Sequence, residues 1–171
     1  MEKQQERATH KTVTTLRKYT EDIAPYRAEG REAEFHKKFT PYETKVIDGN
    51  CLLNTGIDRM WDLVTGATDK IFDFAHAFIG VGDSTTAAGA TQTDLQAASN
   101  SQYNAMETAF PSSTTQKATF KASFATGEAN FAWNEWVVKE TDGAVCLNRK
   151  VESLGTKTTG TWTLEVSITL S

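Results

Sequence analysis

Few side chains in this sequence have the types and spacings that chemistry requires. The two cysteines, Cys51 and Cys146, lie far apart in the chain, and a cysteine nucleophile needs a nearby histidine, for which no local signature is present. The three histidines, His10, His36 and His76, are too scattered to indicate a metal site. We therefore predict that both cysteines are reduced, buried thiols, and that the protein has no catalytic residue, no metal and no other cofactor.

The segment 80–86, which reads GVGDSTT, looks at first like a phosphate-binding loop. It lacks the Gly-Lys-Ser/Thr ending of a P-loop and the glycine spacing of a dinucleotide-binding fingerprint. Carboxylate pairs could in principle serve as a general acid and a general base. The candidate pairs are Asp69/Asp73 and Glu135/Glu140, but a chain with 22 acidic residues forms such pairs by chance. We expect a protein that is not an enzyme.

The densest aromatic cluster is the segment 130–138, NFAWNEWVV. Trp133 and Trp136 are three residues apart, so in a regular strand their side chains point to opposite faces. One would then fill the core, and the other would be exposed as an interface anchor or, less often, as a platform for a sugar ring. The alternative is that both are buried. We therefore name Trp133 and Trp136 as candidate interface residues.

From residue 46 onward, the elements that would position these side chains are mostly strands. Apolar and polar residues alternate over 117–125 and over 161–170, and Asp142-Gly143 between two apolar runs predicts a hairpin. Weaker strand candidates are 74–81 and 104–110. Short strands separated by turns rich in Gly, Thr and Ser predict a mainly β fold, an antiparallel sandwich or barrel-like domain over 46–171.

One short helix is expected within this domain, over residues 54–66. Its apolar residues recur at the spacing i, i+3, i+4 and i+7: Ile57, Met60, Trp61 and Val64. A stripe of this kind usually packs into the core, and we predict that role here. The polar segment 83–100 is predicted to be a surface loop, with a short helical turn at 93–98.

The first 45 residues differ in composition from the rest of the chain. They contain ten Lys/Arg and eight Asp/Glu residues and few aliphatic ones. Their apolar residues are mostly aromatic and widely spaced: Tyr19, Tyr26, Phe35, Phe39 and Tyr42. Such a segment cannot bury enough surface by itself to fold. We predict an extended, charged arm over residues 1–45 whose aromatic side chains bind a partner, while residues 46–171 fold alone; the alternative is a disordered tail.

The length and composition of the whole chain limit the class of protein to which it can belong. A length of 171 residues suits one domain with a genuine core. The net charge of −4 argues against binding to nucleic acid through phosphate neutralisation. No apolar run approaches the roughly 20 residues that a membrane-spanning helix needs, and the polar segment 1–10 predicts no signal peptide. We expect a protein made in the cytosol that binds neither nucleic acid nor membrane.

A resemblance to a known group of proteins lies in five stretches: 53–66, 78–88, 91–98, 132–136 and 147–157. They resemble a group of tailed-bacteriophage virion proteins that are described as structural, minor tail or capsid-associated. The resemblance covers roughly residues 50–171 and does not extend to the predicted arm. It implies a β-rich, non-enzymatic component of a virion, assembled in the host cytoplasm, and it supplies no active-site residues.

Within a virion, the resemblance leaves two roles open. As a capsid decoration (cement) protein, the chain would form homo-oligomers, often trimers, and clamp adjacent subunits of the major capsid protein with its arm. As a tail or tail-fibre protein, it would dock through the arm and present its β-domain to the host. A carbohydrate-binding module is a third hypothesis, which rests on the tryptophans alone. We expect a decoration protein.

Overall fold

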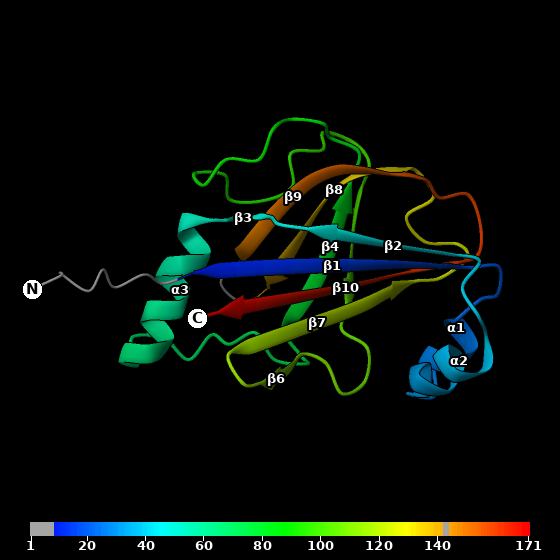
Figure 1. Ribbon diagram of the computed structural model, residues 1–171, viewed down its shortest axis with the longest axis horizontal. Coiled ribbons are helices and arrows are strands. Elements are labelled where there is room, and N and C mark those ends of the chain that lie inside the picture. Colours follow the sequence, from blue (N-terminus) through cyan, green and yellow to red (C-terminus); the bar gives the residue numbers. More distant parts are fainter. Residues whose placement is uncertain (1–8, 142–143) are drawn as a thin grey trace, which may run out of the picture.

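Alternating apolar and polar residues build two antiparallel five-stranded sheets that pack face to face (Figure 1). The computed structural model describes residues 9–141 and 144–171. The first sheet has the order β2 (Glu43–Asp48), β1 (His10–Tyr19), β10 (Thr161–Leu170), β7 (Lys117–Phe124), β6 (Ser112–Thr114). The second has the order β3 (Cys51–Leu52), β9 (Val145–Thr156), β8 (Ala132–Glu140), β4 (Ala77–Gly82), β5 (Ser101–Ala105). The predicted mainly β fold is confirmed, as a sandwich rather than a closed barrel.

The best-patterned strands occupy the middle of the first sheet. β10 pairs with β1 on one side and β7 on the other. Its inward residues Leu164, Val166 and Ile168 are buried in the main core between the sheets. In the second sheet, β8 and β9 pair as the hairpin prediction requires; the turn residues Asp142 and Gly143 lie outside the described residues.

The described part of the chain contains three short helices rather than one. They are α1 (Ala24–Arg27), α2 (Glu32–Lys38) and α3 (Asn54–Thr65). α3 is the predicted helix, and it ends at Gly66, whose φ of 71° is the left-handed conformation that glycine adopts without a side-chain clash. α1 and α2 lie at the opposite end of the sandwich (Figure 1). No described helix is both long enough and apolar enough to cross a membrane.

The prediction of an extended arm is wrong for residues 9–45. β1 is an interior strand of the first sheet, paired with β10 from His10 to Tyr19 and with β2 from Val13 to Lys18. Its inward positions are hard to recognise because they are mostly polar. Thr14 accepts a hydrogen bond from Trp136 Nε1 at 3.2 Å, and the ammonium of Lys18 lies 4.2 Å from the centroid of the Trp162 ring.

Most aromatic residues assigned to the arm form a second core cluster instead of a partner-binding surface. Tyr19 and Phe35 are buried with Ile23 and Ala125, and Tyr26 and Phe39 pack half-buried against them. The rings of Tyr19 and Phe35 meet edge to face, with centroids 5.0 Å apart. α1 and α2 therefore close this end of the sandwich. Tyr42 alone among the five is exposed, at 60%.

The segment 83–100 is a loop, but it packs against the outer face of the second sheet. Glu135 projects from this face and accepts hydrogen bonds from the backbone amides of Gln96 and Ala97. Arg149 pairs with Glu135 at 2.7 Å and donates to Gln92 Oε1 and the Thr86 carbonyl. The predicted helical turn at 93–98 is absent. A fully buried ion pair thus fixes this loop to the sheet.

Candidate interaction surface

Helix α3 is attached to the sandwich by a different side from the one its sequence predicts. Its buried residues are Gly56 and Arg59. A Cβ at Gly56 would lie 2.5 Å from the carbonyl oxygen of Leu147, so only glycine permits this close approach. Arg59 pairs with buried Glu140 at 2.6 Å and also donates to the Lys70 carbonyl. These contacts turn part of the apolar stripe of the helix toward solvent.

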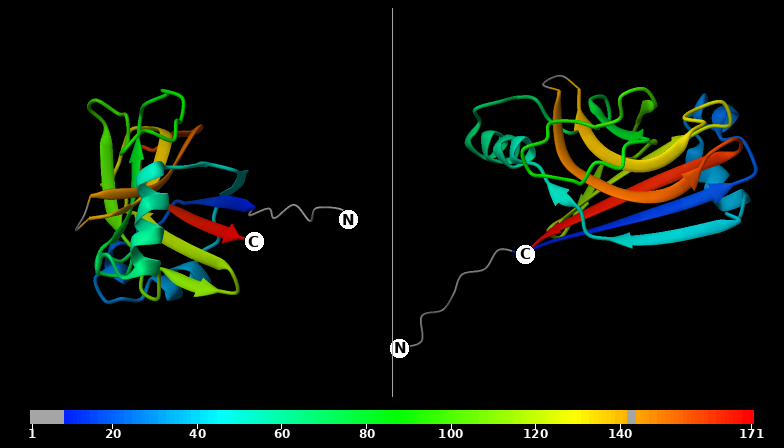
Figure 2. Two further views of the ribbon diagram at one scale, coloured as in Figure 1. Left: turned by 90° about the vertical axis from the view of Figure 1, so that its left-hand side faces the viewer. Right: turned by 90° about the horizontal axis from the view of Figure 1, so that it is seen from above.

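The predicted core role of that stripe is therefore wrong for Trp61 and Val64, whereas Met60 packs against the main core. Trp61 is 64% exposed and Val64 is 75% exposed, while Ile57 and Met60 are half-buried. Leu170, at the end of β10, is exposed beside them. Figure 2 (left) views the molecule from this end, with α3 across the end of the sandwich and the C-terminus beside it.

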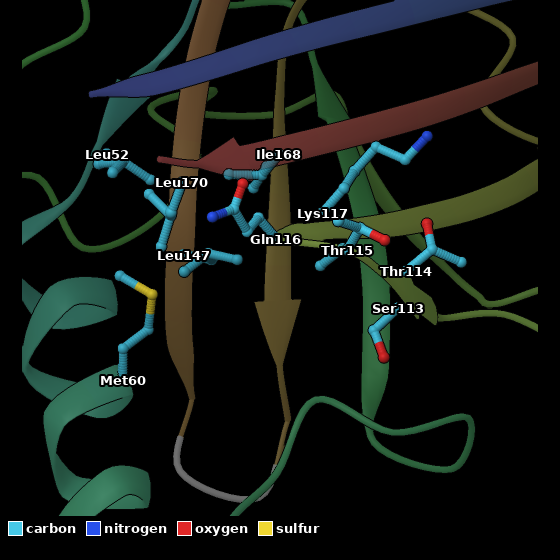
Figure 3. A pocket seen from close by; sticks show the side chains of 11 residues that line it. Leu52, Met60, Ser113, Thr114, Thr115, Gln116, Lys117, Leu147, Ile168 and Leu170 are labelled. Carbon is cyan, nitrogen blue, oxygen red and sulfur yellow. The ribbon is translucent and has the colours of Figure 1, made fainter. Parts of the chain in front are cut away.

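Two adjoining hollows lie at this end of the molecule. The first, of about 390 Å³, lies between the ends of the sheets, where Met60 reaches from α3 toward Leu147 and Leu170 (Figure 3). The second, of about 570 Å³, lies between α3 and the ends of β1 and β10. Both hollows share Leu52, Met60 and Leu170. We call the combined region the end surface, defined by Leu52, Ile57, Met60, Trp61, Val64 and Leu170.

Charges of opposite sign lie on the two sides of the end surface. Asp58 and Asp62 are exposed on α3, on the side of the helix beyond the stripe. Lys11 and Lys117 are exposed on β1 and β7, each paired with Thr169, the residue before Leu170. Within residues 9–141 and 144–171, none of these four side chains forms an ion pair with any other residue. Their charges are available to a partner.

The two tryptophans predicted as interface residues lie inside the molecule. Trp133 and Trp136 are both fully buried in the main core. The pairing of β8 with β9 is irregular between Trp133 and Glu135, which pair with Gly155 and Val151, and both tryptophan side chains point inward to the main core. Their indole nitrogens donate to the Ala129 carbonyl and to Thr14. The interface assignment is wrong for both, and the carbohydrate-binding hypothesis loses its basis.

Both cysteines are free thiols, as predicted, although Cys51 is only partly buried. The Cys146 thiol lies 3.4 Å from Asp94 Oδ1. Burial and the neighbouring Asp94 carboxylate raise the pKa of Cys146 well above its ordinary value. Since the thiolate is the reactive form, this environment makes Cys146 a poor nucleophile.

The histidines lie in three separate places. His10 hydrogen-bonds Asn50 at 2.9 Å, His36 bonds Glu107, and His76 bonds Asp73. Among the described residues, no group of three or more His, Cys, Asp or Glu side chains is arranged to hold a metal ion. Asp73 is bonded to His76, Glu135 is paired with Arg149, and Glu140 is paired with Arg59. The conspicuous feature of the described surface is the end surface.

A buried carboxylate connects α2 to the sandwich and gives a pH prediction. Burial acts to raise the pKa of Glu107, but hydrogen bonds from His36 and Ser123 and the charge of Lys121 outweigh it and lower the pKa. A lowered pKa in the folded state stabilises the protein above about pH 4.5, and this stabilisation is lost as the pH falls through the folded-state pKa.

We therefore expect Glu107→Gln to lower the free energy of unfolding near neutral pH, with the difference from wild type narrowing in acid. Urea denaturation of both proteins across the acid range measures it. A difference that is constant down to pH values below the pKa of Glu107 would contradict this assignment.

Comparison of the chain with protein-family models, with curated proteins and with solved structures found no match.

Proposed function

We propose that the protein is a structural subunit of a tailed-bacteriophage virion, and that it acts by assembling with other protein subunits rather than by catalysis. The resemblance of segments such as 78–88 and 147–157 to phage structural proteins supports the virion context. The end surface supports the mode of action.

The exposed apolar stripe of α3 is the observation that carries this proposal. A contiguous apolar patch at the surface of a folded protein indicates an interaction site, and exposed tryptophan contributes strongly when an interface covers it. Trp61 and Val64 have this exposure, and the Gly56 and Arg59 contacts hold them outward in the folded chain.

Within the virion, we propose the role of capsid decoration protein. The earlier expectation that an N-terminal arm clamps the major capsid protein is withdrawn, because residues 9–45 belong to the fold. A decoration protein of this shape would attach through surfaces of the folded sandwich and would strengthen the shell by adding contacts across subunit boundaries.

The proposal predicts saturable binding of the purified protein to capsids that lack it. Co-sedimentation, with the bound copies counted, measures this binding, and capsids already carrying their full complement are the matched control. A copy number proportional to the number of capsid subunits is expected for a decoration protein. Binding to isolated tails at low copy number would instead assign it to the tail, and binding to neither would contradict a virion role.

A further inference from the structure

We propose that the end surface binds the same surface of a second copy of this chain, so that two molecules associate about a two-fold axis. This inference rests on the proposed function only for the idea that the end surface is an assembly interface. It adds the identity of the partner.

The shape of the end surface suits self-association. A two-fold interface must be self-complementary, so one patch has to supply both projections and recesses. Trp61 and Val64 project from α3, and the hollow beside them has an apolar lining that includes Leu52, Met60 and Leu170. In a two-fold pair, the projecting side chains of each copy enter the hollow of the other.

The charges around the end surface have the same self-complementary arrangement. Asp58 and Asp62 flank it on the helix side, and Lys11 and Lys117 flank it on the strand side. A two-fold rotation brings the acidic side of each copy against the basic side of the other. Such pairing steers association and suppresses partners with the wrong charge pattern.

The N-terminal residues of the same chain are a poorer occupant. Segment 1–8, MEKQQERA, contains Met1 as its only large apolar residue and has four charged residues. It offers too little apolar side chain to cover Trp61, Val64 and Leu170 together. A second copy supplies an equal apolar area.

Two valines give a matched pair of variants for the first test. Val64 lies in the end surface and is 75% exposed, whereas Val46 lies on β2 outside it and is 61% exposed. We expect the wild-type protein to dimerise in sedimentation equilibrium, and Val64→Glu to raise the dimer dissociation constant by about tenfold or more. Val46→Glu should leave it within about twofold, and both variants should retain the wild-type circular dichroism spectrum.

Charge reversal tests the orientation of the two copies. Asp62→Lys and Lys117→Glu should each weaken the dimer, because each places like charges opposite one another. The double variant reverses both sides together and should restore much of the affinity, with the strongest rescue at low ionic strength. Weakening by both single changes without rescue would contradict the two-fold arrangement.

These experiments distinguish a failure of the proposed self-association from a failure of the proposed capsid binding. A wild-type protein that stays monomeric at the highest soluble concentration overturns the dimer. If that monomer binds capsids and Val64→Glu abolishes the binding, the occupant is a capsid protein and the virion role stands. A dimer that resists Val64→Glu also overturns the proposal, because its interface then lies elsewhere. A dimer sensitive to Val64→Glu that binds neither capsids nor tails supports the interface and contradicts the virion role.

Discussion

A chain that begins at Val46 is expected not to fold. Its truncation removes β1, which lies between β2 and β10, and it also removes α1 and α2. The lost side chains include Leu16, Tyr19 and Phe35, all buried, and each such side chain contributes about 1.5–3 kcal/mol by burial. Together with the lost strand pairing, this is comparable with the roughly 5–15 kcal/mol that stabilises a typical domain, so little or no stability is left to the truncated chain.

Thermal and urea unfolding followed by circular dichroism measures the effect. The control deletes residues 2–8, which precede β1 and leave its pairing intact. We expect a cooperative transition for the control and none for residues 46–171. A cooperative transition in the shorter chain would show that β1 is dispensable, contrary to its place in the sheet.

Arg149→Met is expected to destabilise the protein more than Glu107→Gln or the loss of an exposed charge. Arg149 and Glu135 are both fully buried, and their side chains approach to 2.7 Å. Removing one partner of a buried pair leaves an uncompensated charge and typically costs about 3–5 kcal/mol. Glu135 retains hydrogen bonds from the amides of Gln96 and Ala97, which places the expected value at the lower end.

The matched control is Arg17→Met, which breaks the half-exposed Arg17–Glu165 pair on the first sheet. Its expected cost is below about 1 kcal/mol, because solvent screens that pair. Adding Glu135→Gln to Arg149→Met should recover part of the lost stability, because it removes the unpaired buried charge of Glu135. Equal losses from Arg149→Met and Arg17→Met in urea unfolding would contradict the structural role of the buried pair.

The sequence predicted the strands whose inward residues are consistently apolar. β7 and β10 are of this kind, and their alternation is confirmed by burial of residues such as Phe120 and Leu164. β1 escaped prediction because its inward positions include Thr12, Thr14 and Lys18, which become suitable core residues only through contacts with β8 and β10. Periodicity within one segment does not contain that information.

The end surface could not be predicted either, for a related reason. The spacing of Ile57, Trp61 and Val64 indicates an amphipathic helix but not which side meets the sandwich. That choice depends on the close approach of Gly56 to the Leu147 backbone and on the buried Arg59–Glu140 pair. Trp133 and Trp136 show the converse error: regular alternation predicts opposite faces, but the strand pairing is irregular between them and both side chains are buried.

The most direct test of the account is hydroxyl-radical footprinting of Trp61 in purified virions and in dilute free protein. Tyr42, which is 60% exposed against 64% for Trp61 and lies outside the end surface, shows whether protection is specific. We predict that the protein is present in virions and that oxidation of Trp61 falls much more than that of Tyr42. Absence of the protein from virions, or equal oxidation of Trp61 in the two states, would contradict the end surface as an assembly interface.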